Sequence, residues 1–171
     1  MSTIPPPIQG CIEACERCEL VLDAVTSDLY AVGRNGHRSI GAHLRHALEH
    51  VLCFVDGLPK GLIDYDSRDR DEALERDPEI LRQKLREVSA ALLEIPEQGL
   101  THSVSVRQAA SLDTGPATLQ STVERELVFI SSHMIHHLAV IVAYCREEDV
   151  QLPEETALAF STSAFLKAAA Q

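Results

Sequence analysis

Apolar residues recur along this chain with helical spacing, and each series of them stops at proline or glycine. After the prolines at 5–7, apolar side chains repeat at this spacing from Ile8 until Gly33, which predicts a first helix there. Ser39 is a good N-cap for a second series, which runs to Gly57. Each series leaves an apolar face that must be buried, so we expect several helices to pack against one another.

The middle of the chain contains a third helical series and then a change of pattern. Asp77 followed by Pro78 predicts an N-cap and a first helical residue, and this helix continues to about Glu94. Residues 96–116 differ, because valines alternate with polar residues at 103–107. Alternation of this kind favours a short extended stretch or a hairpin.

A long helix is predicted near the end of the chain, starting at Thr118 or Ser121 and reaching about Glu147. Residues 151–171 form an extension, either a short helix or a packed coil. Four amphipathic helices in 171 residues predict one all-α domain, an antiparallel up-down four-helix bundle with its core at about residues 8–150. The short extended segment precedes the last bundle helix.

The charge balance disfavours polyanionic partners. The formal net charge is −11, from 15 Lys and Arg against 26 Asp and Glu. Such a chain is repelled by nucleic acid and by anionic lipid surfaces. The sequence has no signal-type N-terminus and no apolar run of about 20 residues. We therefore expect a soluble cytoplasmic protein that binds neither nucleic acid nor membrane.

The five cysteines are interpreted as reduced thiols. Cys11, Cys15 and Cys18 share one face of the first helix, and no His or Cys pair accompanies them at zinc-finger spacing. We expect them, like Cys53 and Cys145, to pack as small hydrophobic residues rather than to form a soft-metal site.

Histidine is the unusual component, with eight residues against four Phe, three Tyr and no Trp. His43, His46 and His50 lie within about 60° of arc on the second helix. On the last helix His133 and His137 have the i, i+4 spacing with which zinc-protease helices bind one ion. The glutamate of that protease motif is missing, since Met134 follows the first histidine, so protease chemistry is not supported.

A third histidine from the second helix would complete a site with open coordination positions, as expected for a catalytic ion. Spacing alone leaves His43, His46 and His50 as alternatives for this ligand. The competing interpretation is that these histidines are packed or surface residues that bind no ion. Neutral imidazoles suit Zn, Ni, Fe or Cu alike, so the ligand type does not select the ion.

The stretches SIGAHLRHALEH and ERELVFISSHMIHHLAVI resemble the DinB/YfiT-like superfamily of metal-dependent enzymes. In that family a serine at the start of the second helix is followed seven residues later by the first metal ligand, as Ser39 is followed by His46 here. An H-x-x-x-H motif on the last helix supplies the other two ligands. The resemblance implies a four-helix bundle that binds a divalent metal, Zn, Ni or Fe, through His46, His133 and His137, with His136 as a non-ligand.

The resemblance also implies a function, and this sequence departs from the family motif at one place. It implies a hydrolase-like or thiol-dependent transferase or isomerase reaction on a small molecule, with a low-molecular-weight thiol among the candidates, and we expect a homodimer. Many family members continue the motif as H-H-R-x-Q, whereas this chain reads HHLAVI, so those basic and amide groups are apolar here. The alternative function is a non-catalytic bundle, a stress or interaction protein with a structural metal or none.

Further residues are candidates for roles around the metal. His50 lies one turn beyond His46 and is expected near the ion, as a fourth ligand, a general base or a neighbour. Glu126 precedes His133 by seven residues and is expected to orient a ligand imidazole, the alternative being a surface pair with Arg125. The loop after the second helix carries three candidates for binding a substrate carboxylate or phosphate, or else a solvated charge run: Tyr65, Arg68 and Arg70.

Overall fold

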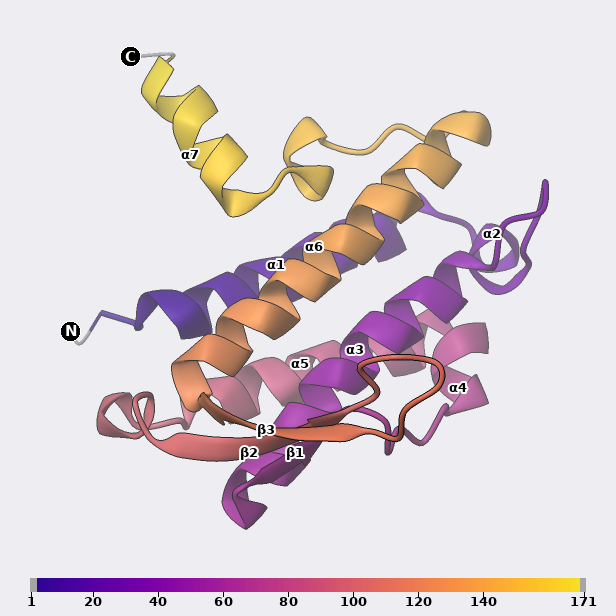
Figure 1. Ribbon diagram of the computed structural model, residues 1–171. Coiled ribbons are helices and arrows are strands. Elements are labelled where there is room, and N and C mark those ends of the chain that lie inside the picture. The colour runs from indigo at the N-terminus through magenta and orange to yellow at the C-terminus, as the bar shows by residue number, and fades with distance from the viewer. Residues whose placement is uncertain (1–2, 170–171) are drawn as a thin grey trace.

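The computed structural model describes residues 3–169 and is mostly helical (Figure 1). It has four long helices: α1 (Pro6–Ala24), α3 (Ile40–Gly57), α5 (Pro78–Leu93) and α6 (Val123–Glu147). Both α1 and α3 contact α5 and α6. The interface between α3 and α6 brings together the two histidine-bearing segments.

Side-chain caps set the starts of the long helices. Ser39 Oγ accepts a hydrogen bond from the backbone N–H of Ala42, and the Asp77 carboxylate accepts from two backbone N–H groups beyond Pro78. Both predicted N-caps are therefore confirmed. The predicted start of α6 at Thr118 or Ser121 is wrong, because Thr122 is the N-cap and the residues before it form a strand.

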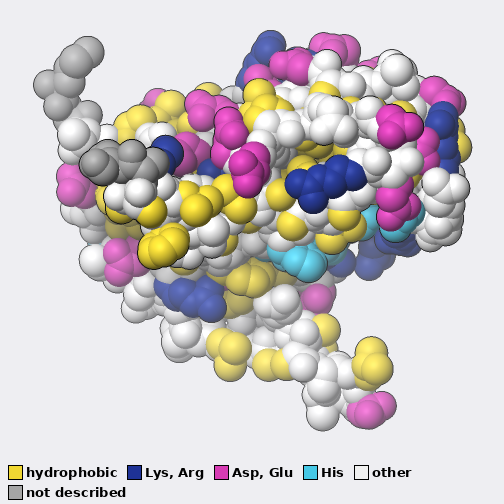
Figure 2. Space-filling view, turned by 90° about the horizontal axis from the view of Figure 1, so that it is seen from above, with side chains coloured by type: hydrophobic (Ala, Val, Ile, Leu, Met, Phe, Trp, Pro, Cys, Tyr) yellow, Lys and Arg dark blue, Asp and Glu magenta, His cyan; other side chains and the backbone are white. Residues whose placement is uncertain are grey.

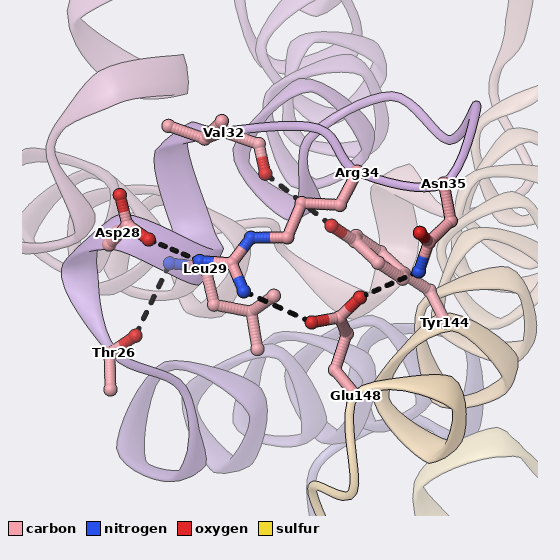
Figure 3. A network of polar contacts seen from close by, with 8 residues as sticks. All are labelled: Thr26, Asp28, Leu29, Val32, Arg34, Asn35, Tyr144 and Glu148. Carbon is pink, nitrogen blue, oxygen red and sulfur yellow. Dashed lines mark hydrogen bonds and ion pairs between the residues drawn. The ribbon is translucent and has the colours of Figure 1, made fainter.

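The first helix is shorter than predicted. It ends at Ala24, and α2 (Ser27–Ala31) follows, with Thr26 accepting a hydrogen bond from the backbone N–H of Leu29. The threonine caps a new helix and so interrupts the apolar series. Arg34 then bridges Asp28 and Glu148, which joins this region to the end of α6 (Figure 3).

A small three-stranded sheet modifies the all-α expectation. β2 (Ser103–Gln108) pairs antiparallel with β3 (Ala117–Thr122), which confirms the extended segment as a hairpin. β1 (Leu62–Asp64), which the sequence analysis missed, pairs parallel with β2. Because β3 leads directly into α6, the sheet holds the start of that helix beside the loop that follows α3.

Short elements complete the chain: α4 (Glu72–Arg76), α7 (Phe160–Ala169) and three 3-10 turns at Leu58–Lys60, Glu97–Gly99 and Glu154–Ala157. A Cβ at Gly41 would lie 2.0 Å from the backbone oxygen of Glu75, so glycine allows α4 to approach the start of α3 closely. Arg17 donates to the backbone oxygen of Leu158 at 2.6 Å and fixes the chain before α7 against α1. Of the two forms expected for the extension, its described residues include the helix, α7.

Helix α6 is the main apolar element of the core. Its most apolar 18 residues have a mean hydropathy of 1.6, so by length and composition it is the one helix among residues 3–169 that could cross a bilayer. In the structure 50% of that stretch is buried inside the protein. Core helices of soluble proteins meet the same criterion, so the absence of a membrane partner stays a prediction.

Candidate metal centre

Histidines from two helices meet between α3 and α6. His46 and His50 come from α3 and His133 from α6, and one ring nitrogen of each lies within 4.8 Å of the others. The rings of His50 and His133 are centred 4.1 Å apart, and those of His46 and His50 4.7 Å apart. His46 and His50 lie on successive turns of α3, so the i, i+4 spacing on one helix positions two of the three rings.

Hydrogen bonding leaves two of these imidazoles with nitrogens suited to a ligand role. Nδ1 of His50 lies 2.9 Å from the carbonyl oxygen of His46, and since a carbonyl only accepts, this nitrogen carries the proton. The lone pair of neutral His50 is therefore on Nε2. Nε2 of His133 is buried and has no hydrogen-bond partner in the described part of the chain. An orphaned buried nitrogen beside two other imidazoles fits a metal ion.

His137 and His43 form an adjoining pair. Their Nδ1 atoms are 3.2 Å apart, and the ring of His137 is centred 4.7 Å from the rings of both His46 and His133. One of the two Nδ1 atoms donates its proton to the other. His136 is exposed, as expected for the non-ligand of the motif.

Burial keeps the clustered imidazoles neutral. It is the largest cause of lowered pKa values at His46, to about 3, at His133, to about 4, and at His137, to about 3. Repulsion between neighbouring histidines lowers these pKa values further. Burial also lowers the pKa of His50. Neutral imidazole is the form that binds a metal, so no proton has to leave near neutral pH. On the face seen in Figure 2, histidine side chains reach the surface only over small areas.

Of the predicted substrate residues, Arg68 lies at the cluster. Its Nη1 donates to Nδ1 of His46 at 3.0 Å, so the lone pair of His46 points to the guanidinium. Arg68 also lines a cavity of about 600 Å³ beside the second half of α3. Arg70 is exposed, has a φ of 53° and does not line this cavity.

Tyr65 and Glu126 form a buried pair behind His50. The Tyr65 hydroxyl donates to Glu126 at 2.9 Å, and the Ser121 hydroxyl donates to the same carboxylate at 2.6 Å. The ring of Tyr65 stacks on that of His50 at 5.5 Å. Glu126 was expected to bond a ligand imidazole directly; here it holds Tyr65, which packs against His50. The sequence offered no signal for this link, because the two residues come from elements 61 positions apart.

Comparisons with known proteins identify no family for this chain. No family model matches it. FK506-binding protein 5 of Rhizopus delemar is 31% identical over 107 residues, which cover 62% of this chain and 28% of that protein. No solved structure matches. The chain thus spans little more than a quarter of the length of this relative, and the resemblance to the DinB/YfiT-like superfamily stays an interpretation of the motifs.

Proposed function

We propose that this protein binds one divalent transition metal through His46, His50 and His133 and uses it in small-molecule chemistry. The observation that carries the proposal is the orphaned, buried Nε2 of His133, which lies in a group of three imidazoles whose nitrogens are within 4.8 Å of one another. An unpaired buried nitrogen costs about 1–3 kcal/mol, a cost that a bound ion would remove.

The motif implies His46 and His133 as ligands, and both belong to the group of clustered imidazoles, whereas the motif and the cluster differ in the third histidine. The motif favours His137, and the geometry supports His50, because the carbonyl of His46 fixes the His50 tautomer with Nε2 free. A second hydrogen bond that fixes tautomer and ring orientation is the usual companion of a metal-bound imidazole. His137, by contrast, is not part of the group of imidazoles whose nitrogens lie within 4.8 Å of one another.

The fold we propose is a DinB-like antiparallel four-helix bundle with an added sheet. Contacts of α1 with α6, α6 with α3, α3 with α5 and α5 with α1 support a closed ring of four helices. Bundles of this kind build metal sites from side chains on facing helices. The cytoplasmic location and the homodimer inferred from the sequence stay predictions, the second of which sedimentation would test.

An ion at this site would supply Lewis acidity toward a substrate oxygen or sulfur. Three protein nitrogens leave coordination positions open, which is typical of catalytic rather than structural sites. Arg68 both donates to His46 and lines the cavity beside α3, and this shared residue supports access by a small molecule from the cavity. We propose hydrolase-like or thiol-dependent transfer chemistry, Zn, Ni or Fe being the candidate ions.

Metal analysis tests the proposal directly. Protein purified without an affinity tag, stripped with a chelator and titrated with Zn²⁺ should bind about one ion per chain. His50→Ala should weaken binding at least about a hundredfold, and His137→Ala less than about tenfold, because loss of a ligand exceeds the effect of a neighbour. The reverse order would assign His137 as the third ligand.

The control for these variants is His136→Ala, which removes an exposed imidazole one residue from His137 and should leave Zn²⁺ binding unchanged. Failure of the wild-type protein to bind any ion would overturn the proposal. An ion whose coordination is closed by a fourth protein ligand would favour the structural alternative.

A further inference from the structure

We propose that Arg68 forms an anion-binding position beside the histidine cluster and that this position takes a small molecule with a single carboxylate group. The inference rests on the proposed metal function and adds a substrate class to it. It is carried by the partners of Arg68, by the chemistry of its contact with His46 and by the charges that line the adjoining cavity.

Arg68 is unlike the other half-buried arginines of the described chain. Each of the others donates to an oxygen atom: Arg17 to Leu158, Arg45 to Glu75 and Arg82 to Asp23. Arg68 instead donates to a neutral imidazole, while its Nε, like that of Arg45, is buried without a partner among the described residues. No carboxylate of residues 3–169 forms an ion pair with it, although the chain has a net charge of −11. A partly buried cation without a counter-charge is costly, and a bound anion would remove the cost.

The hydrogen bond between Arg68 and His46 cannot coexist with coordination of a metal by His46. A neutral imidazole has one nitrogen with a lone pair and one that carries a proton. While Nδ1 accepts from Arg68, the proton is on Nε2, so the ring has no lone pair left for an ion. Coordination through either nitrogen therefore ends the hydrogen bond and frees Nη1 of Arg68.

Metal binding and anion binding therefore favour each other. Three neutral imidazoles do not compensate the charge of a divalent ion, and the freed guanidinium adds another positive charge beside it. The nearby carboxylate of Glu126 already accepts hydrogen bonds from Tyr65 and Ser121. An anion that binds here strengthens metal binding, and by linkage the metal strengthens anion binding by the same factor.

The cavity limits the anion to a single negative group. Arg68 lines it together with two lysines and five acidic residues: Lys60, Lys84, Glu49, Asp56, Asp64, Asp69 and Asp71. The planar guanidinium matches a carboxylate in a two-point contact. The acidic wall repels any further negative charge, so the remainder of the molecule is neutral or cationic. A volume of about 600 Å³ suits a small metabolite.

The test combines Co²⁺ as the metal probe with acetate, inorganic phosphate and citrate as anion probes. Calorimetry gives the affinities, and the visible spectrum of bound Co²⁺ reports an anion near the ion. In the wild-type protein, acetate should bind more tightly to the Co²⁺-loaded than to the metal-free form, and more tightly than phosphate or citrate.

Arg68→Met should change the two affinities in opposite directions. Co²⁺ binding tightens severalfold, because the competing hydrogen bond and the positive charge are gone. Acetate binding to the loaded protein weakens by about tenfold or more, since a charge-assisted hydrogen bond is lost. Arg68→Lys retains the charge without the two-point contact and gives an intermediate acetate affinity. Arg70→Met removes the same charge two residues away and should change neither affinity.

Each failure identifies what is wrong. If the wild-type protein binds no Co²⁺, the proposed function and this inference both fall. If Co²⁺ binds and Arg68→Met weakens metal and acetate together, or leaves acetate binding unchanged, Arg68 is structural and only the inference falls. Tighter binding of phosphate or citrate than of acetate would overturn the single-carboxylate class. Should Arg68→Met fail to fold, the wild-type comparison of loaded and metal-free protein and the Arg68→Lys variant still decide the question.

Discussion

Helix α6 has two buried faces that differ in how they treat polar atoms. Toward α1 the interface is apolar, and the thiol of Cys11 donates to the backbone oxygen of Leu127 at 3.1 Å. Toward α3 the interface contains imidazoles, and one of them, His133, has a buried nitrogen without a partner among residues 3–169. The polar group buried in the first face has a hydrogen-bond partner, whereas the second face leaves the Nε2 atom of His133 free to bind a ligand. This difference indicates that the α1 face stabilises the fold and the α3 face is the one adapted to bind something.

The ionisable groups of the two faces support the same distinction. Burial raises the pKa of Cys11 to about 12 and that of Cys15 to about 11, so both thiols stay protonated. A protonated thiol is neither a nucleophile nor a metal ligand. Burial lowers the pKa values of the histidines, which keeps them neutral and able to bind an ion. Burial thus makes the thiols of one face unreactive and keeps the imidazoles of the other face able to bind a metal.

The largest effect is expected from a cavity in the apolar face. Leu127 is fully buried, and Leu127→Ala should lower the free energy of unfolding by about 2–5 kcal/mol. Chemical denaturation measures this loss. Because Leu127 lies on the α1 side, the folded variant should still bind one Zn²⁺ per chain with wild-type affinity.

The matched control is Val128→Ala, which truncates a side chain that is 52% exposed on the same helix. It should change stability by no more than about 0.5 kcal/mol. A loss of metal affinity in Leu127→Ala would contradict the separation of the two faces.

Acid should destabilise the protein through the α3 face. Unfolded histidines have a pKa near 6.5, whereas the pKa of His133 in the structure is about 4 and that of His46 about 3. Between these values the unfolded state binds more protons than the folded state, so stability falls as the pH decreases below about 6.5. Metal-free protein should therefore lose several degrees of Tm between pH 7 and pH 5, as calorimetry measures.

Two comparisons sharpen this prediction. His133→Asn should flatten the dependence of Tm on pH, because one shifted group is gone. Between pH 7 and pH 8 the Tm should change less than between pH 7 and pH 5, because unfolded histidines are mostly neutral there and unfolded thiols only begin to ionise. A Tm that is independent of pH between 7 and 5 would show that the imidazoles are solvated rather than buried.

Helical periodicity predicted the long helices and the two histidine-bearing segments that meet, because apolar spacing and caps are local properties. Ser39 and Asp77 act as N-caps as their sequence contexts indicate. β1 was missed because three residues are too few for a recognisable alternation, and its pairing with β2 is a long-range contact. Likewise the start of α6 was placed too early because β3 has no apolar pattern of its own.

For the candidate site, spacing predicted which faces of α3 and α6 meet but not which nitrogens are free. The tautomer of His50 depends on the carbonyl of His46, and the lone pair of His46 depends on Arg68. Neither contact follows from positions along one helix alone. Glu126 shows the same limit, since it was expected to orient a ligand imidazole, whereas its partner is Tyr65, which lies on the chain after β1.

The smallest effect is expected from Tyr65→Phe. This variant tests whether the contacts of Tyr65 with the histidine cluster affect stability and Zn²⁺ binding. The variant retains the ring that stacks on His50 and removes the hydroxyl that donates to Glu126. Because the carboxylate still accepts from Ser121, stability should fall by only about 0.5–1.5 kcal/mol, and Zn²⁺ affinity should fall only a few-fold. Tyr65→Ala removes the ring as well and should weaken Zn²⁺ binding more, by up to about a hundredfold. If the two variants bind Zn²⁺ equally well, the ring of Tyr65 does not position His50. The Zn²⁺ affinity of the face of α6 toward α3 would then depend on the histidines alone.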